Sequence, residues 1–209
     1  ANNQNACNLP VLRVPQQARF HYGPGERWNT LVPSSKQRED LAERLAPVLA
    51  SVSTGCGDAA FAVVRDGGLS HCIARHVGSY PVQVLVIQVG TRQPLGVGAA
   101  GLALLSALAD RDVEAVIDVN APTLALYRGM TQARLRALVA ATRERGWSLV
   151  GNHATQGVLA VGLAVYDRDG DVVAGISVAT TEARMPKERQ RKILQLIRKA
   201  LRAHGFVAY

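Results

Sequence analysis

The stretch that decides the fold of this chain is PLGVGAAGLALL, residues 94–105. Gly96, Gly98 and Gly101 match the spacing G-x-G-x-x-G, which is typical of a turn that binds the phosphates of a dinucleotide. The same small residues suit a helix that packs closely against a sheet. Such a helix start would also leave backbone N–H groups free to bind a small carboxylate or another anion. The segments on either side decide between these interpretations.

Two hairpin patterns surround this stretch and favour a mostly antiparallel sheet covered by helices. Each consists of two apolar runs joined by an Asp-Gly turn, the first over residues 59–77 and the second over residues 158–179. Asp-Gly between apolar runs is typical of a hairpin, because glycine tolerates the positive φ that the turn needs. A dinucleotide-binding unit would instead need strands and helices to alternate.

The remaining segments predict helices and short strands. Residues 82–89 are rich in β-branched side chains and predict a strand. Six residues lie between its end and Gly96, a gap too long for the tight turn of a dinucleotide fold. Apolar spacing predicts the other elements, namely helices over 35–49, 95–108, 131–145 and 186–204, a short strand at 147–150, and a loop containing Pro122. We expect Pro47 to kink the first helix or weaken its end.

Composition allows one domain of ordinary size with its own apolar core. Apolar residues make up 48% of the 209 residues, enough to form a core without cross-links. No apolar run is long enough to span a membrane, and residues 1–10 lack the pattern of a signal peptide. The three cysteines are odd in number and form no C-x-x-C, which favours a reducing compartment. We therefore expect a cytoplasmic protein.

The two ends of the chain differ in character. Residues 1–35 are polar and contain four prolines, which is typical of an arm or linker. We therefore expect an N-terminal arm over residues 1–35 and one folded domain over residues 36–209. The net charge of +8 is concentrated in residues 184–202, which contain eight Lys or Arg side chains and one Glu. This pattern predicts either a solvated helix face or a surface that attracts anionic partners.

The sequence contains little that points to catalysis or metal binding. His71, Cys72 and His76 are close together, but His71 and His76 would point to opposite faces of a regular strand, and a third ligand is missing. Ser177 lacks the glycines of a G-x-S-x-G nucleophile elbow, and His153 has no partner that would complete a triad. We therefore expect no catalytic residue, no metal and no cofactor.

Several segments together resemble the C-terminal effector-binding domain of IclR-type bacterial transcription regulators. Residues 90–105 are similar to the family's block G-x-x-x-P-L-x-x-x-A-x-G-x-x-L-L. The other similar segments are FHYGP at 20–24 (the linker Y-x-L-G-P), LAERLAPVL at 41–49 (the first helix), RGW at 145–147 (R-x-x-G-[YW]), the hairpin over 157–179, and Arg184. None of these motifs is specific alone, but their order and spacing extend over most of the chain.

The resemblance implies an α/β (α+β) fold of the GAF-like or profilin-like type, in which a curved antiparallel sheet and its loops hold a small organic acid. It also implies homodimers or homotetramers and a winged helix-turn-helix domain upstream. No helix-turn-helix pattern precedes residue 20, so we expect this chain to reach DNA only through a domain outside it. A truncated protein, a proteolytic fragment and a stand-alone sensor remain open.

Three polar positions of the family's pocket are replaced in this chain. The family often has D-x-E where this chain has Gly151-Asn152-His153, and the family's Cys and final Ser fall on Ala160 and Ala179. Buried carboxylate oxygens need hydrogen-bond partners, so these replacements argue against a small keto acid. They favour a bulkier or more apolar effector, such as an aromatic acid, or no effector at all.

By position, the resemblance places nine residues around the effector: Val82, Leu85, Gln93, Ala99, Ala100, Val158, Ala160, Ser177 and Ala179. Ser177 and the backbone amides near Ala99 and Ala100 are the expected polar contacts. The leading hypothesis is a ligand-sensing and oligomerising domain without catalysis. Two alternatives remain, an enzyme that binds a nicotinamide cofactor between Gly96 and Gly101, and a purely structural dimerisation module with a filled core.

Overall fold

The computed structural model describes residues 34–152 and 155–208. A curved six-stranded sheet has the order β3-β2-β1-β6-β5-β4, and each pair of neighbouring strands is antiparallel. The strands are β1 (Ala59–Asp66), β2 (Leu69–His76), β3 (Arg92–Pro94), β4 (Ser148–Gly151), β5 (Val158–Tyr166) and β6 (Val172–Thr181). This confirms the predicted mixed class with an antiparallel sheet and both predicted hairpins. The described sheet thus offers the glycine motif no parallel βαβ unit.

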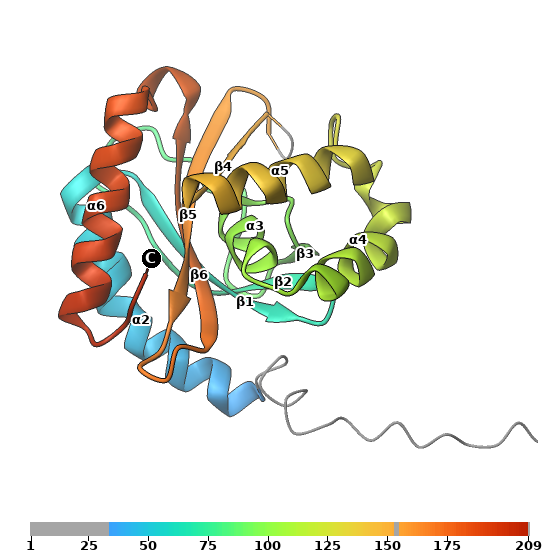
Figure 1. Cartoon of the computed structure of the whole chain (residues 1–209). Helices are drawn as coiled ribbons and strands as arrows, with labels where there is room; N and C mark the ends of the chain where they lie inside the picture. The colour runs from blue at the N-terminus through green and yellow to red at the C-terminus, as the bar shows by residue number, and fades with distance from the viewer. Residues whose placement is uncertain (1–33, 153–154, 209) are drawn as a thin grey trace, which may run out of the picture.

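Helices cover both faces of the sheet (Figure 1). On one face α2 (Ser35–Cys56) packs beside α6 (Lys187–Ala203), which follows the short 3-10 helix η1 (Glu182–Arg184). On the other face α3 (Ala99–Ser106) lies directly on the strands, with α5 (Gln132–Arg145) and α4 (Asp110–Leu124) outside it. Each face has its own apolar core. The expected arm lies outside the described residues except for Ser34 and for Ser35, which already belongs to α2.

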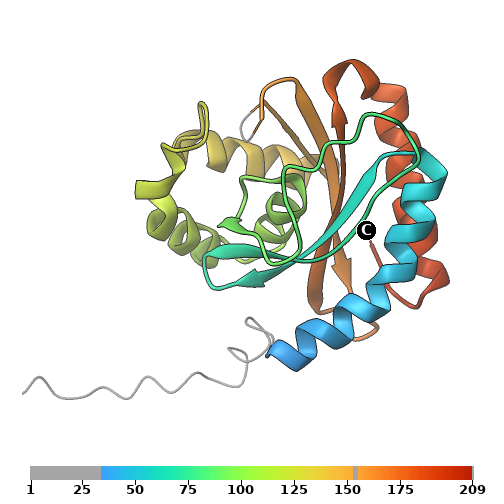
Figure 2. The same cartoon turned by 180° about the vertical axis from the view of Figure 1, so that it is seen from behind.

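The strand predicted over residues 82–89 is absent, and this prediction is wrong. The segment between β2 and β3 runs as an irregular extended loop, and only Arg92–Pro94 joins the sheet (Figure 2). β-branched side chains favour an extended backbone, but a strand also needs a partner. Among the described residues, the sheet offers this segment none.

The helix α4 is a second correction, because its residues were predicted to form a loop around Pro122. Val113, Val116, Ile117 and Leu124 are buried on one side of this helix. Pro122 lies in the last turn of α4. The helical spacing of the apolar residues was present in the sequence, and the proline obscured it.

Two other helices differ from their predicted ends. Pro47 does not end α2, which continues to Cys56 and is closed by Gly57 in the left-handed region (φ 78°). Pro47 is exposed, so the carbonyl that it leaves without a partner faces solvent, while the buried stripe continues to Val52. The helix predicted over 95–108 is shorter, because α3 begins only at Ala99.

The glycines of the sheet let α3 approach the strands closely. A Cβ on Gly175 of β6 would lie 2.3 Å from the carbonyl oxygen of Ala100, and one on Gly162 of β5 would lie 2.9 Å from the backbone of Ala99. Neither position tolerates a side chain unless the helix moves. The Ser148 hydroxyl donates a hydrogen bond to the Ala99 carbonyl oxygen over 2.6 Å. These contacts hold the first turn of α3 over β5 and β6.

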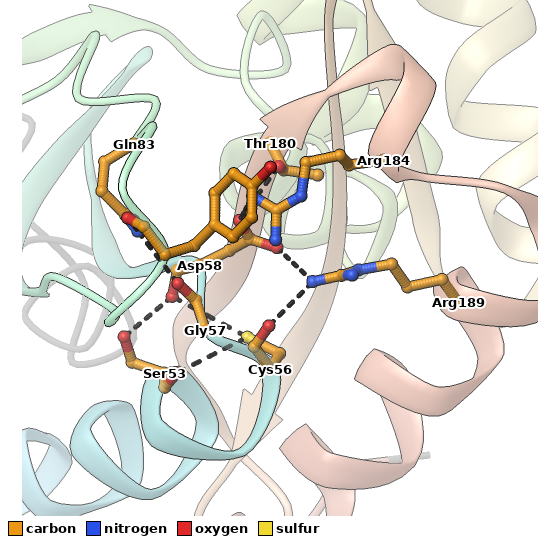
Figure 3. A network of polar contacts seen from close by, with 9 residues as sticks. Ser53, Cys56, Gly57, Asp58, Gln83, Thr180, Arg184 and Arg189 are labelled. Carbon is orange, nitrogen blue, oxygen red and sulfur yellow. Dashed lines mark hydrogen bonds and ion pairs between the residues drawn. The ribbon is translucent and has the colours of Figure 1, made fainter.

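A buried carboxylate, Asp58, joins the start of β1 to the opposite end of the chain (Figure 3). Its two oxygens accept hydrogen bonds from Arg184 (2.7 Å) and Arg189 (2.6 Å), and Thr180 donates a third over 3.0 Å. The guanidinium of Arg184 also stacks on the ring of Tyr80. Asp58 is 1% exposed, so these partners offset the cost of removing its charge from water.

The same cluster anchors the beginning of the loop that follows β2. The Gly57 carbonyl oxygen accepts hydrogen bonds from the backbone N–H of Tyr80 (2.9 Å) and from the carboxamide of Gln83 (2.9 Å). The Ser53 hydroxyl donates to the Asp58 carbonyl oxygen over 2.8 Å. The junction between α2 and β1 therefore connects α2, α6 and the loop after β2.

We expect Asp58→Ala to destabilise the domain strongly, because it leaves two partly buried guanidinium groups without a counter-charge. Breaking a buried ion pair costs about 3–5 kcal/mol. The matched control is Asp110→Ala, which removes an exposed pair with Arg143 and should cost about 1 kcal/mol or less. Urea unfolding measures both. Equal losses for the two variants would contradict a structural role of the Asp58 cluster.

Gly175→Ala should also destabilise the domain, because the new Cβ collides with the backbone of α3. Overpacking of this kind costs about 1–3 kcal/mol. Gly55→Ala is the control, since its Cβ would meet only the flexible end of Leu196, and alanine favours a helix by up to about 1 kcal/mol. The unfolding midpoint should fall for the first variant and stay or rise for the second. An unchanged midpoint for Gly175→Ala would argue against the close approach.

Candidate functional site

A partly open cavity of about 60 Å³ lies beside the N-terminus of α3. This volume is enough for several water-sized groups and is bounded mostly by apolar atoms. The residues that line it are Phe61, Val86, Ile87, Gln93, Val97, Gly98, Ala99, Val150, Gly151, Asn152, Thr155, Val158, Ala160, Ser177 and Ala179. They come from the sheet, from α3 and from three loops.

Small side chains on the sheet leave the space that forms the cavity. Val150, Ala160, Ala179 and Ala59 lie opposite one another across four neighbouring strands, so one row of the sheet is built mainly from alanines. In the adjacent row, Gly162 lies directly beneath α3. Because α3 is held over that second row, the alanine row stays uncovered at the helix start. The cavity follows from this offset.

Polar groups at the cavity belong to the backbone of α3 and to the four uncharged side chains of Gln93, Asn152, Thr155 and Ser177. The helix begins after Gly98, so the backbone N–H groups of Ala99 and Ala100 have no intrahelical acceptor, and of these two residues Ala99 lines the cavity. A Cβ on Gly98 would lie 2.7 Å from Gln93 Nε2, so the Gln93 carboxamide lies close to the start of α3. Ser177 is on the floor of the cavity between Phe61 and Gly162. None of the described residues that line the cavity is ionisable.

A cation lies behind one wall of the cavity. Arg75 is opposite Phe61 in the β1–β2 pairing, so both side chains project from the same face of the sheet. Its Nη1 donates a hydrogen bond to the carbonyl oxygen of Ile87 over 3.3 Å. The loop that carries Val86 and Ile87 is therefore held against the sheet by a positive side chain.

The wall formed by the β4–β5 connection depends on Asn152. Asn152 adopts the left-handed region (φ 65°), and its side-chain oxygen accepts a hydrogen bond from the Gly157 N–H over 2.7 Å. This side chain is thus already engaged in closing the turn. The next residue, His153, for which no triad partner was expected, lies outside the described residues.

The structure brings six of the nine predicted site residues together around this cavity, namely Gln93, Ala99, Val158, Ala160, Ser177 and Ala179. The other three do not line it. Val82 and Leu85 are exposed by 58% and 41%, because the loop after β2 turns them to the surface. Ala100 is buried against Gly175 further along the sheet. Contact of any of these residues with an effector remains a prediction.

Sequence reasoning missed several residues that line the cavity. Phe61 was detectable, because it alternates with Ala59 and Val63 on the strand face that packs toward α3. Val86 and Ile87 were assigned to a strand, and nothing in their local pattern indicates that they would close a cavity. Thr155 lies in a loop, where the spacing of apolar residues along the sequence does not indicate which way a side chain points.

The expected geometry of the His71–Cys72–His76 group is wrong in one respect. Ile73 is an extra residue in β2, so His71 pairs with Val64, His76 pairs with Ala60, and both histidines face α2. They remain four ladder positions apart. Burial raises the pKa of the Cys72 thiol to about 11, which disfavours the thiolate that would bind a metal. Residues 34–152 and 155–208 contain no group of three or more potential metal ligands.

Comparison with known proteins agrees with this architecture. The sequence profile of the family described as "Bacterial transcriptional regulator IclR C-terminal" matches residues 34–204. The chain is 24% identical over 165 residues to the HTH-type transcriptional regulator KipR of Bacillus subtilis and 26% identical over 166 residues to the Pca regulon regulatory protein of Pseudomonas putida. Each match covers 78% of this chain, but only 65% and 56% of those two relatives.

A solved structure shows the same fold. The crystal structure of Thermotoga maritima IclR superposes with a TM-score of 0.69 at 18% identity, and the match covers 80% of this chain and 67% of that one. Among the described helices of our protein, none is both long enough and apolar enough to cross a membrane. The profile match, the regulators of similar sequence and the shared fold together establish that this chain belongs to the IclR family of bacterial transcriptional regulators, as the C-terminal effector-binding domain.

Proposed function

We propose that this domain senses a small organic acid, an aromatic acid being the best fit, in the cavity beside α3. The observation that supports this most directly is the juxtaposition of the free backbone N–H group of Ala99, at the start of α3, with an alanine-lined floor. A carboxylate would accept hydrogen bonds from the helix start, where the helix dipole also favours negative charge. The apolar body of the acid would lie over Ala160 and Ala179.

Charge and polarity around the cavity support an acid that is mainly apolar. The described residues of the lining include no ionisable side chain, so among them a second charged group on the ligand would be buried without a partner. Arg75 behind the wall adds positive potential, which favours one carboxylate. Phe61 offers an aromatic ring that a second ring could pack against.

We further propose that the effector acts on DNA binding by changing how subunits of an oligomer are placed. The relative named KipR is described as an HTH-type regulator, and the present chain spans about two thirds of it. A helix-turn-helix domain outside this chain would contact DNA in the bacterial cytoplasm. The effector would favour one arrangement of the subunits, and thus one spacing of those DNA-binding domains.

The two alternatives from the sequence receive less support. A purely structural module would have its core filled at Ala99, whereas a cavity lies there. An enzyme that used Gly96 to Gly101 for a nicotinamide cofactor would need these glycines at a phosphate-binding turn after a parallel strand. Gly96 instead forms a turn at φ 103°, and Gly101 packs against Ser70.

Ligand binding is expected to stabilise the domain against heat. With an acid at a hundred times its Kd, the free energy of unfolding rises by about 2.7 kcal/mol, or about 5–10 °C in Tm for a protein of this size. Ala160→Leu should abolish the shift by filling the cavity. Ala164→Leu is the control, since Ala164 lies on the same face of β5 but lines a separate cavity. A panel of aromatic and keto acids that never shifts the wild-type Tm would refute the proposal.

Ser177→Ala tests the polar contact on the cavity floor. No hydrogen bond between described residues engages the Ser177 hydroxyl, so the ligand is its expected partner. Loss of one neutral hydrogen bond costs about 0.5–1.5 kcal/mol, which is about a two- to tenfold rise in Kd. Ser106→Ala should leave the Kd unchanged, because that hydroxyl bonds to Leu102 in α3. Titration calorimetry with an acid found in the panel measures both, and equal effects would contradict the assigned position.

A further inference from the structure

A second cavity, of about 200 Å³, lies between the C-terminal ends of α3 and α5 and the end of β5 (Figure 1). It shares no lining residue with the candidate effector cavity. Ala103 of α3 and Ala164 of β5 form part of its lining, and two aromatic residues, Trp147 and Tyr166, border it. Its volume is on the order of ten times the space that one water molecule needs, which is enough for a small ring.

The strand β5 has an unpaired backbone position at this cavity. On its β4 side, Gly162 pairs with Ser148, and Tyr166 exchanges two backbone hydrogen bonds with Val207, over 2.8 and 2.9 Å. Alternate residues of an antiparallel strand direct both backbone groups to the same edge. The N–H and C=O of Ala164, which lies midway between Gly162 and Tyr166, therefore point to that edge as well.

The strand β4 does not reach the position opposite Ala164. Continuing the β4–β5 register would place Gly146 there, but β4 begins only at Ser148. The Gly146 N–H instead donates to the carbonyl oxygen of Thr142 at the end of α5, over 2.9 Å. Among the described residues, no backbone partner is left for Ala164 on this edge, where the cavity lies. A ligand in the place of Gly146 would complete the pairing.

A buried hydroxyl adds another group without a partner. Thr142 of α5 lines the cavity and is 4% exposed, yet its hydroxyl has no hydrogen-bond partner among the described residues. A threonine within a helix can bond to a carbonyl oxygen one turn earlier, and this one does not. The hydroxyl can therefore turn toward a ligand without losing a bond. Because buried polar groups nearly always have a partner, this hydroxyl indicates a polar contact at the cavity wall.

The charge at this cavity is already balanced by the protein. Arg143, which lines it, donates to the carbonyl oxygens of Ser106 (2.9 Å) and Leu108 (2.6 Å) and to the carboxylate of Asp110 (2.6 Å). No carboxylate lines the cavity among the residues that the structure describes. A charged ligand would therefore lose its hydration without gaining a free counter-charge, so an uncharged ligand is favoured.

We propose that this second cavity binds an uncharged flat ring with an N–H and a C=O on one edge, as in a heteroaryl carboxamide. The ligand N–H would donate to the Ala164 carbonyl oxygen, and the ligand C=O would accept from the Ala164 N–H, as a paired strand residue does. The ring would pack against Trp147 or Tyr166, and the Thr142 hydroxyl would bond to the carboxamide. Both the place and the ligand differ from those of the proposed effector site.

A ligand-observed NMR titration of the whole chain with pyrrole-2-carboxamide tests the proposal. The ring N–H and the carbonyl of this compound are separated by one carbon, as in a strand residue, and saturable binding is expected. Ala164→Leu should raise the Kd at least about tenfold, because the larger side chain occupies the cavity. Ala137→Leu is the matched control, since it makes the same change at an exposed position of α5 outside the cavity, and should leave the Kd unchanged.

A second ligand and a third variant test the hydrogen bonds themselves. With 1-methylpyrrole-2-carboxamide the Kd should be at least about fivefold higher, because the missing N–H leaves the Ala164 carbonyl without its partner. Thr142→Val, which removes the hydroxyl at similar volume, should raise the Kd of pyrrole-2-carboxamide about two- to tenfold. Circular dichroism and Tm report whether each variant is folded, and Thr142→Val decides if Ala164→Leu is not.

Four results would overturn the proposal: no saturable binding by the wild type, an unchanged Kd in the deciding variant, an equal loss in Ala137→Leu, or equal affinity for the methylated ligand. The titration contains no acid and the cavities share no residue. Failure of carboxamide binding therefore leaves the proposed effector site untouched, and a failed panel of acids leaves this second cavity untouched.

Discussion

The close approach of α3 to the sheet is the contact on which the rest of the structure depends. Gly162 and Gly175 remove the two side chains that would keep the helix away from the strands. With its first turn held over these glycines and bonded through Ser148, the helix start lies beside the alanine row and does not cover it. The space that these two glycines leave for α3 therefore brings its free N–H groups, the apolar floor and Ser177 to a single cavity.

The second constraint is electrostatic and lies on the opposite side of the sheet. Removing Asp58 from water is costly, and the two arginines that offset this cost come from η1 and α6, more than a hundred residues away. The same junction binds Tyr80 and Gln83 through Gly57. Because these residues begin the loop that later contributes Val86 and Ile87 to the cavity, α6 and the cavity wall are joined by one connected set of contacts.

Each glycine of the stretch at residues 94–105 has a structural use. Gly96 adopts a positive φ in a turn where a side chain would also collide with Leu135. Gly98 makes room for the Gln93 carboxamide, and Gly101 packs on Ser70. The spacing G-x-G-x-x-G thus arises here from a turn and two close contacts. A glycine pattern therefore indicates that another group approaches the backbone closely. Which group approaches, a phosphate or a protein side chain, depends on the fold.

Local sequence determined which segments form hairpins and helices, and which face of each is buried. The Asp-Gly turns, the helical stripe of α6 and the C-terminal glycine of α5 depend only on neighbours in the chain, so they were predictable. The tertiary structure alone decided three other features. Residues 82–89 have the pattern of a strand but no partner strand among the described residues. The extra residue Ile73 turned His76 to the face of His71, and the cavity arises where α3 does not cover the alanines. Each depends on which surface lies opposite, and periodicity within one segment contains no information about that surface.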